Sequence, residues 1–356
     1  MTPGRKIQVV VVDDSSFMRT AITRLLERDG RFEVVGQAKD GRAAVDAALQ
    51  LKPDVMTMDV NMPALDGVGA VRQIMRRCPL PVVMLSAHTT QGARATLEAL
   101  SAGAVDFVSK PSGEVSADLS RVEHELTEKL VLASTAQCSR SVTGAQVLQR
   151  TTRDPAAGPR LLSHVGTGST AGPRLVVIAV STGGPSALAR VIPALPADLD
   201  CCVLIVQHLP PGFTAALAAR LADQCSVEVR EAQPGDRLYQ GTVLVAPGGR
   251  HMIVDHALTI GVSDDPPVNG CRPSADVTMR SAAAALGSRV TGVVMTGMSR
   301  DGAEGLRAIR QVGGQTVAQD EGSCVIYGMP RAAVELGVVD RVVTLDGLAA
   351  AIRSRW

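Results

Sequence analysis

A serine, a histidine and an aspartate in the second half of the chain stand where acyl-transfer chemistry would need them. Each follows an apolar run that predicts a buried strand: Ser181 follows residues 175–180, His208 follows 201–206, and Asp301 follows 290–295. Because the carboxyl ends of parallel strands meet at one edge of a sheet, these side chains can converge. The serine would attack a carbonyl, the histidine would take and return its proton, and the carboxylate would orient the imidazole.

The turn that carries the serine reads Ser181-Thr-Gly-Gly-Pro185. Its glycines let a substrate approach the backbone closely, and the helix predicted over residues 186–195 offers N–H groups to a developing oxyanion. A glycine turn that binds a nucleotide or a phosphate is the alternative for this stretch alone. The chain order serine–histidine–aspartate, without a Gly-x-Ser-x-Gly motif, differs from that of the α/β-hydrolases and implies another fold.

Other polar residues of this half are interpreted as structural. His251 and His256 flank a predicted hairpin, and we expect both of them to face solvent. Asp276 and Asp320 are expected to be helix caps.

A second chemical group lies in the first half of the chain, again at the predicted ends of strands. It comprises Asp13, Asp14, Asp59, Ser86 and Lys110. Three converging carboxylates repel one another unless a hard divalent cation neutralises them, and oxygen ligands of this kind suit Mg²⁺. The lysine and the hydroxyl then complete a cradle for a phosphoryl group on Asp59, at the end of the central strand.

The elements that must position this group follow a regular alternation. Apolar runs predict strands at residues 8–12, 33–38, 55–58, 81–85 and 105–108, and helical patterns begin near Ser15, Asp40, Asp66, Thr90 and Ser116. Five strand–helix units at this spacing predict an α/β domain of the flavodoxin-like type, with a five-stranded parallel sheet and its site at the carboxyl ends of the strands.

Length and composition limit the possible classes of protein. A chain of 356 residues predicts two domains, and a net charge of +1 argues against general attraction to nucleic acid or to membranes. No apolar run approaches the ~18–20 residues of a membrane helix, so we expect no membrane insertion. The seven cysteines contain no CxxC pair, which favours reduced thiols in the cytoplasm and no zinc site.

Periodicity fades between the two halves, where Ser, Thr, Gly, Ala and Pro dominate. We therefore predict one domain over residues 5–124, a linker helix and flexible linker over 125–172, and a second domain over 173–356. No helix-turn-helix pattern or basic patch follows the first domain, which argues against a DNA-binding output.

The first half resembles the receiver domain of two-component response regulators. The resemblance rests on VVDDS at 11–15, MDVNMPALDG at 58–67, LSA at 85–87 and DFVSKP at 106–111. It implies that Asp13, Asp14 and Asp59 form an acidic pocket for Mg²⁺ and that a chemotaxis histidine kinase phosphorylates Asp59. It also implies that Ser86 is the hydroxyl switch residue and that Lys110 contacts the phosphate.

The second half resembles the catalytic domain of the chemotaxis protein-glutamate methylesterases. The resemblance rests on STGGP at 181–185, QHLP at 207–210, CRPSAD at 271–276, TGMSRDGA at 296–303 and YGMPRAA at 327–333. It implies a mostly parallel three-layer α/β domain with Ser181 as nucleophile, His208 as base and Asp301 as its partner, and no cofactor for the esterase chemistry. The residues that it places in the substrate groove or oxyanion site are Thr182, Gly183, Arg272, Ser274 and Met298.

The resemblance also implies a function. Family members demethylate glutamyl methyl esters on methyl-accepting chemotaxis receptors, releasing methanol, and deamidate receptor glutamines. Phosphorylation of the receiver is expected to relieve a restriction on access to the serine. Two alternatives stay open: a receiver-gated scaffold or binding protein with a degenerate esterase domain, and a methylesterase that serves a chemosensory array other than that for motility.

The chain departs from the family pattern in two places. Ala179 and Val180 stand where Gly-Ala usually precedes the serine, and Ser299 stands where a glycine is common. Neither change removes a catalytic group, so we expect an altered rate or selectivity rather than inactivity.

Overall fold

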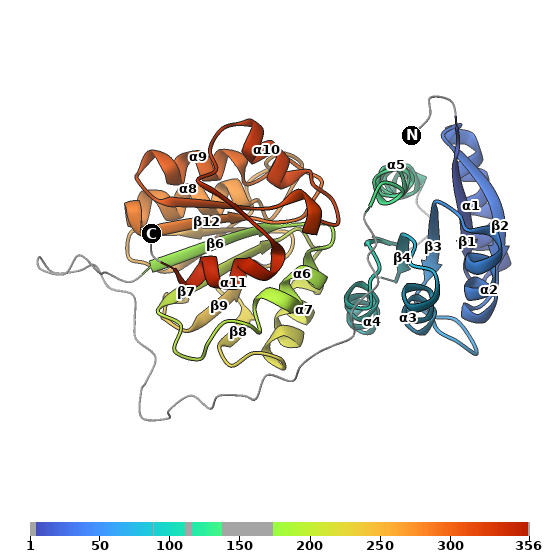
Figure 1. Ribbon diagram of the computed structural model, residues 1–356, viewed down its shortest axis with the longest axis horizontal. Helices are drawn as coiled ribbons and strands as arrows, with labels where there is room; N and C mark the ends of the chain where they lie inside the picture. The colour runs from blue at the N-terminus through green and yellow to red at the C-terminus, as the bar shows by residue number, and fades with distance from the viewer. Residues whose placement is uncertain (1–4, 88, 111–115, 137–173, 355–356) are drawn as a thin grey trace, which may run out of the picture. The chain divides into compact units, whose positions relative to one another are not determined.

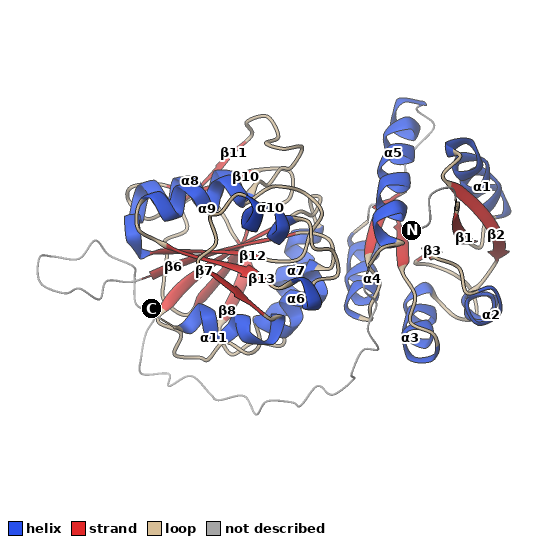
Figure 2. Cartoon of the chain, turned by 45° about the horizontal axis from the view of Figure 1, so that its top comes forward, coloured by secondary structure: helices blue, strands red, loops and turns tan. Residues whose placement is uncertain are grey.

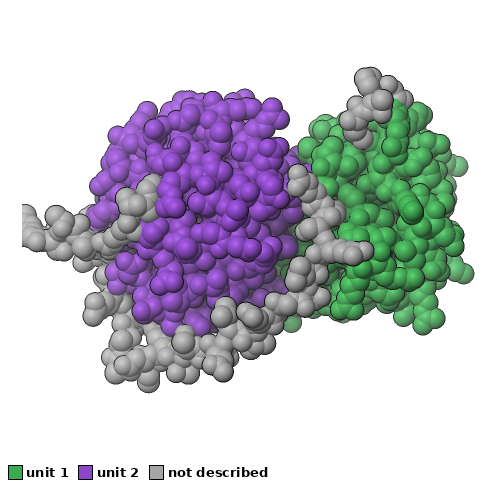
Figure 3. Space-filling view, in the orientation of Figure 1, with its two compact units in different colours: residues 1–144 green, residues 145–356 purple. Residues whose placement is uncertain are grey.

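The computed structural model describes residues 5–87, 89–110, 116–136 and 174–354 of the chain. They divide into two compact units, residues 1–144 and 145–356 (Figure 3). Most of the segment for which the sequence predicts a flexible linker, residues 137–172, lies outside the described residues.

The first unit is built on a five-stranded parallel sheet in the order β2-β1-β3-β4-β5. The strands are β1 (Ile7–Val12), β2 (Phe32–Ala38), β3 (Val55–Asp59), β4 (Val82–Ser86) and β5 (Asp106–Ser109). They alternate with helices α1 (Ser16–Asp29), α2 (Gly41–Leu51), α3 (Gly67–Arg77), α4 (Thr90–Ser101) and α5 (Ser116–Ala133) (Figure 1). The flavodoxin-like sheet predicted from the sequence is confirmed.

Local chemistry sets where its helices begin. The side chains of Ser15, Asp40, Asp66 and Thr89 each accept a hydrogen bond from the amide three residues further on, which satisfies one of the amides left free at a helix start. The strand order reverses direction beside β1, so the sheet opens a crevice at the carboxyl ends of β1 and β3.

Helix α5 crosses residue 124, where the sequence predicted the receiver to give way to a linker helix. Leu126 and Leu130 are buried, and the helix packs on β4, β5 and α1. The apolar stripe of α5 therefore belongs to the core of the first unit as far as Ala133.

The second unit is built on a seven-stranded sheet in the order β14-β13-β12-β6-β7-β9-β8, in which neighbouring strands pair in parallel. The strands are β6 (Arg174–Val180), β7 (Cys201–Gln207), β8 (Glu228–Glu231), β9 (Thr242–Val245), β12 (Val290–Val294), β13 (Gln315–Gln319) and β14 (Arg341–Val343). A separate antiparallel hairpin joins β10 (His251–Val254) to β11 (Ile260–Ser263).

Helices cover both faces of this sheet and make three layers. Figures 1 and 2 show α8, α9 and α10 on one face and α6, α7 and α11 on the other. The helices are α6 (Gly184–Val191), α7 (Phe213–Ala222), α8 (Ala275–Leu286), α9 (Ala303–Gln311), α10 (Met329–Glu335) and α11 (Leu348–Arg353), with short 3₁₀ turns η1 (Gly287–Arg289), η2 (Glu321–Ser323) and η3 (Leu345–Gly347). The predicted three-layer α/β class is confirmed.

Helix α6 ends earlier than the sequence suggested, because Pro193 lacks the amide hydrogen that the next helical turn would need. The chain runs from β6 to β7 on one side of the sheet and later returns to β12 on the other, so β6 lies at the topological switch point. A site is expected in the crevice at the carboxyl ends of β6 and β12. Among the described residues, no helix has the length and apolar character that crossing a membrane would require.

Candidate active site and acidic pocket

Ser181 is the first residue after β6, and its backbone is held from three sides. Its N–H donates to the carbonyl of Thr296 (3.0 Å), while its own carbonyl accepts from the amide of Gly184 (2.8 Å) and from Nε2 of Gln207 (3.0 Å). These bonds tie the serine to the loop after β12 and to the end of β7. The turn is therefore rigidly positioned at the switch point.

Two glycines make room for this turn. Gly183, before α6, has φ +76°, a conformation that L side chains rarely adopt. A Cβ on Gly297 would lie 2.8 Å from Cβ of Ser181 and 2.3 Å from Sδ of Met329. The loop after β12 can approach the serine only because position 297 has no side chain.

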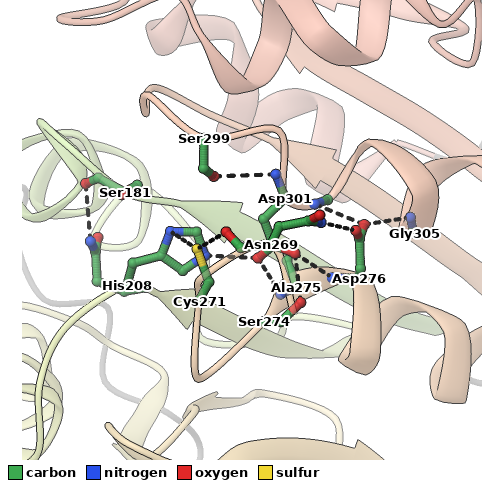
Figure 4. A network of polar contacts seen from close by, with 12 residues as sticks. Ser181, His208, Asn269, Cys271, Ser274, Ala275, Asp276, Ser299, Asp301 and Gly305 are labelled. Atoms are coloured by element: carbon green, nitrogen blue, oxygen red, sulfur yellow. Dashed lines mark hydrogen bonds and ion pairs between the residues drawn. The ribbon is translucent and has the colours of Figure 1, made fainter. Parts of the chain in front are cut away.

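His208 follows β7, and its ring nitrogens have different partners. Its backbone N–H donates to the carbonyl of Val180 (3.2 Å), so it lies level with the end of the strand that carries Ser181. Its Nε2 lies 2.7 Å from Oδ2 of Asp301, and its Nδ1 lies 3.6 Å from Sγ of Cys271 (Figure 4). Within the described residues, no hydrogen bond joins the Ser181 hydroxyl to the imidazole.

Asp301 is fully buried and its carboxylate is saturated with donors. Besides His208, it accepts hydrogen bonds from the hydroxyl of Ser274 (2.6 Å) and from the amides of Ala275 (2.6 Å) and Asp276 (3.1 Å). Those amides form the first turn of α8, where the helix dipole favours a negative charge. The anion is therefore stabilised by the fold itself and cannot rotate freely.

Asp276, on α8, makes the reciprocal interaction with the start of α9. One carboxylate oxygen accepts from the amides of Gly302 (2.9 Å) and Gly305 (2.7 Å), and the other accepts from the Asn269 side chain (3.0 Å). Each helix start is thus capped by an aspartate from the other helix's neighbourhood (Figure 4). The capping role expected for Asp276 is confirmed, although it caps a helix other than its own.

These contacts shift the pKa values of the pair in opposite directions. Burial lowers the pKa of His208, but hydrogen bonds to Asp301 and Cys271 outweigh it and raise the pKa to about 9. Burial raises the pKa of Asp301, but the hydrogen bonds from His208, Ser274 and Ala275 outweigh it and leave the pKa below its usual value. Asp301 is therefore a carboxylate at neutral pH, and His208 is a stronger base than a free imidazole.

The residues predicted to line a groove have different environments. Met298 is 39% exposed, and Arg272 is exposed and donates to the carbonyls of Asp264 (3.0 Å) and Asp265 (3.2 Å). Thr182 and Gly183 are buried, and the Thr182 carbonyl accepts from the Thr296 hydroxyl (2.9 Å).

Ser274 requires a correction, because it is fully buried and cannot line a groove. Its hydroxyl donates to Asp301, so its place in the structure is behind the carboxylate.

The expectation that both hairpin histidines face solvent is wrong for His251. This residue is 1% exposed, because β10 packs against α8. Its Nδ1 accepts from the amide of Ser274 (3.1 Å), and its Nε2 donates to the carbonyl of Pro266 (3.2 Å). His256, in the turn of the hairpin, is exposed.

The acidic pocket of the first unit is formed at the ends of β1, β3 and β5. Carboxylate oxygens of Asp13, Asp14 and Asp59 lie within 4.8 Å of one another. Lys110 places its Nζ 2.8 Å from Asp13 and 2.9 Å from Asp59. Three hard oxygen donors at this separation, one of them on an exposed residue, fit a magnesium ion that keeps several of its waters.

The electrostatics of this pocket differ from residue to residue. Burial and the neighbouring Asp13 raise the pKa of Asp59, and the Lys110 ammonium offsets only part of this effect. Burial lowers the pKa of Lys110, but its two carboxylate partners outweigh it and raise the pKa. Ser86 is buried at the end of β4, and its hydroxyl lies 2.7 Å from that of Thr96 on α4.

Two residues of the esterase site, Cys271 and Asn269, were not identified from the sequence. Cys271 and Asn269 lie in a loop, and Cys271 is 63 positions away from His208, so no spacing pattern links them. The CRPSAD segment marked the region without indicating which of its side chains face the imidazole.

Comparisons with known proteins agree with this division. Residues 176–352 match the CheB methylesterase family, and residues 9–118 match the response regulator receiver domain family. The chain is 49% identical over 351 residues to a protein-glutamate methylesterase/protein-glutamine glutaminase of Symbiobacterium thermophilum, covering 98% of this chain and 96% of that one. It is 48% identical over 342 residues to the protein of the same name from Archaeoglobus fulgidus, covering 94% of each.

A solved structure is also similar. The second unit resembles the crystal structure of the Thermotoga maritima CheB methylesterase catalytic domain with a TM-score of 0.50 and 34% identity. The match covers 51% of this chain and 98% of that one.

Proposed function

This chain belongs to the protein-glutamate methylesterases/protein-glutamine glutaminases that carry a receiver domain, and we propose that Ser181, His208 and Asp301 carry out its hydrolysis. The enzyme acts in chemotaxis as a carboxylic ester hydrolase with glutaminase activity. One observation carries the assignment of the three residues: the buried Asp301 carboxylate lies 2.7 Å from His208 Nε2, at the sheet edge where Ser181 follows β6. This arrangement is typical of a base held by its orienting acid.

The contact with Asp301 determines which ring nitrogen of His208 can act as the general base. With Nε2 donating to the carboxylate, the lone pair available to Ser181 is on Nδ1. The serine Oγ attacks the side-chain carbonyl of a glutamyl methyl ester while its proton moves to Nδ1. The tetrahedral intermediate then collapses, the C–O bond to the methoxy group breaks, and the proton on Nδ1 leaves with methanol.

A water molecule completes the cycle. Nδ1 takes a proton from the water as its oxygen attacks the acyl-enzyme, and it returns that proton to Ser181 as the serine ester breaks. The product is a free glutamate side chain. A glutamine substrate follows the same path with ammonia as the leaving group, so one site serves both activities.

The amides of the turn and the neighbouring loop are proposed to stabilise the oxyanion. Gly183 and Thr182 precede α6, and Met298 stands on the loop that Gly297 brings close to Ser181. Arg272, exposed beside the site, is proposed to contact the receptor segment around the glutamate.

The receiver is proposed to regulate the esterase. Asp59 would accept a phosphoryl group from a chemotaxis histidine kinase, with Lys110 contacting the phosphoryl oxygens and Ser86 responding as the switch hydroxyl. Asp13, Asp14 and Asp59 would hold Mg²⁺, which when bound neutralises the charge that gathers at the carboxylates and the phosphoryl group. Phosphorylation would then raise esterase activity by shifting the receiver to its second state.

Methyl-accepting chemotaxis receptors are the proposed substrates, and the cytoplasm is the proposed location of the reaction. The boundaries of the receiver (5–124), linker (125–172) and catalytic domain (173–356) stay proposals as well.

A triad test uses methylated receptor membranes. Methanol release and ammonia release would be measured for the parent, Ser181→Ala, His208→Gln and Asp301→Asn. In each of the three variants, we expect methanol release and ammonia release to fall together. Retention of either activity in Ser181→Ala would contradict the assignment of the nucleophile.

A further inference from the structure

The thiol of Cys271 lies at the imidazole nitrogen that Asp301 leaves open. Its Sγ is 3.6 Å from Nδ1 of His208, and its other polar contact is with the carbonyl of Asn269, also at 3.6 Å. Both side chains are partly exposed, so solutes can reach them. The mechanism above uses Nδ1 as the base but assigns no part to the thiol.

The separation of these two atoms suits a tetrahedral metal ion. Zinc binds thiolate sulfur at about 2.3 Å and imidazole nitrogen at about 2.0–2.1 Å, so two such ligands at a tetrahedral angle lie about 3.5–3.6 Å apart. The observed distance is 3.6 Å. The separation of Sγ and Nδ1 therefore matches that of two ligands of one tetrahedral Zn²⁺ ion.

The other ring nitrogen has the partner that a metal-bound histidine requires. Histidine ligands almost always donate their second N–H to a carboxylate or a carbonyl, which fixes the tautomer and the ring orientation. Here Nε2 meets Asp301 at 2.7 Å. Because the carboxylate already accepts from Ser274, Ala275 and Asp276, it would act as this outer partner and not as a ligand.

We propose that Cys271 and His208 form a binding site for a thiophilic divalent cation such as Zn²⁺, and that occupation of this site inhibits the esterase. The Cys271 thiol would lose its proton to solvent on binding, the ion would take thiolate Sγ and Nδ1 as ligands, and water would fill the other positions. The inhibition rests on the proposed function, because the ion would occupy the lone pair that takes the proton of Ser181. The metal site itself does not depend on that role.

The absence of a CxxC pair does not bear on this site, because its ligands lie 63 positions apart in the chain. The acidic pocket of the first unit is the competing site for a cation. It offers carboxylate oxygens from Asp13, Asp14 and Asp59, which are hard ligands, whereas the Cys271 site offers a soft thiolate. A probe that reports on sulfur ligation separates the two.

Cobalt supplies that probe. The full chain would be titrated with Co²⁺ in excess Mg²⁺, and the thiolate-to-cobalt charge-transfer band would be followed in the near ultraviolet. We expect the band in the parent and in Cys78→Ser, which removes the other partly exposed cysteine of the described residues. It should be lost in Cys271→Ser and Cys271→Ala. A parent without the band, or a band that survives in both Cys271 variants, would overturn the proposal.

Zinc inhibition is then measured as methanol release in excess Mg²⁺, with each variant compared with its own rate without zinc. The concentration for half-inhibition should rise roughly tenfold or more in Cys271→Ser, since loss of even an outer-shell partner of a metal typically costs 10–100-fold in affinity. Cys78→Ser should match the parent. If the cobalt band forms while zinc leaves the esterase at full rate, the inhibitory role and the assignment of Nδ1 as base both fail, although the metal site stands.

Discussion

Both units place carboxylates at the carboxyl ends of the strands of a parallel sheet, but the surroundings of these carboxylates differ in charge. In the acidic pocket, Asp13 and Asp59 share Lys110, and the pKa of Asp59 is raised by burial and by its neighbour. In the esterase site, the Asp301 carboxylate accepts hydrogen bonds from four donors, and its pKa is lowered. The acidic pocket therefore has more carboxylate charge than Lys110 can neutralise, whereas the negative charge of Asp301 is fully stabilised by its hydrogen bonds.

This difference matches two kinds of chemistry. In the acidic pocket, the Lys110 ammonium neutralises only part of the carboxylate charge. Such a cluster is suited to binding a metal ion and a phosphoryl group reversibly. A carboxylate fixed by the first turn of α8 suits a static role, because its charge and position stay constant while His208 gains and loses a proton. The parallel sheet edge is common to both, and the donors around each carboxylate set its function.

The largest effect is expected for Ser181→Ala, which would remove the nucleophile and leave the carboxylates untouched. Methanol release should fall by about 10⁴–10⁶-fold, in line with loss of the serine in other serine hydrolases. Ser299→Gly, in the same loop as Asp301, is the matched control and should change the rate far less. Similar losses in the two variants would mean that the site is merely disrupted.

Asp301→Asn tests whether the negative charge of the Asp301 carboxylate is needed for catalysis. The amide cannot carry the charge that stabilises the protonated imidazole, and a loss of about 10³–10⁴-fold in kcat is expected. The receiver should be unaffected, so phosphorylation of Asp59 by a small phosphodonor, followed by mass spectrometry, should match the parent. A parallel loss of phosphorylation would contradict the separation of the two sites.

The pH profile sharpens the comparison further. The base must be deprotonated to accept the serine proton, and hydrogen bonds to Asp301 and Cys271 raise the pKa of His208 to about 9. The value of kcat/KM should therefore rise about tenfold per pH unit below that point and level off above it. In Asp301→Asn the residual activity should level off at a lower pH, because burial then acts without the carboxylate. A parent profile that is flat from pH 6 to 9 would count against His208 as the base.

Asp59→Asn addresses the other site. The variant should keep the basal rate of methanol release and lose the increase caused by phosphodonor and Mg²⁺, since the esterase site is unchanged. The measurement is the ratio of the two rates in parent and variant. An Asp59→Asn protein that still responds to phosphodonor would remove the proposed role of the acidic pocket.

The smallest effect on rate is expected for Val180→Ala. Val180 is fully buried in β6 and packs beside Gly184. Because its side chain is buried, we no longer expect Val180 to cause the altered rate that the sequence suggested. The loss of two methyl groups should lower the free energy of unfolding by about 2 kcal/mol while leaving kcat/KM close to that of the parent. A large change in kcat/KM would show that the departure from the family's usual alanine does narrow the pocket.

The sequence predicted the strands whose ends carry chemistry, because each was a distinct apolar run followed by a polar or glycine-rich turn. The four outer strands of the second sheet, β8, β9, β13 and β14, escaped prediction. Strands β8 and β14 are short and carry charged residues, such as Glu228 and Arg341. The edges of the sheet are thus less visible in the sequence than its centre.

The residues around each carboxylate were harder to infer than the carboxylates themselves. Ser274 and Asp276 act on Asp301 and α9 through contacts that span more than 20 positions. His251 was assigned to the surface because it flanks a predicted hairpin, yet α8 packs against its strand and it is buried. Such contacts depend on how α8 packs, which no local pattern in the sequence records.

The central claim is that phosphorylation of Asp59 in the first unit regulates the Ser181 esterase in the second. Its most direct test is methanol release from methylated receptor membranes, measured with and without a small phosphodonor plus Mg²⁺. We predict a release that rises with phosphodonor in the parent, stays at the basal level in Asp59→Asn and vanishes in Ser181→Ala. A release that is the same with and without phosphodonor would contradict the regulation, and a release that persists in Ser181→Ala would contradict the esterase mechanism.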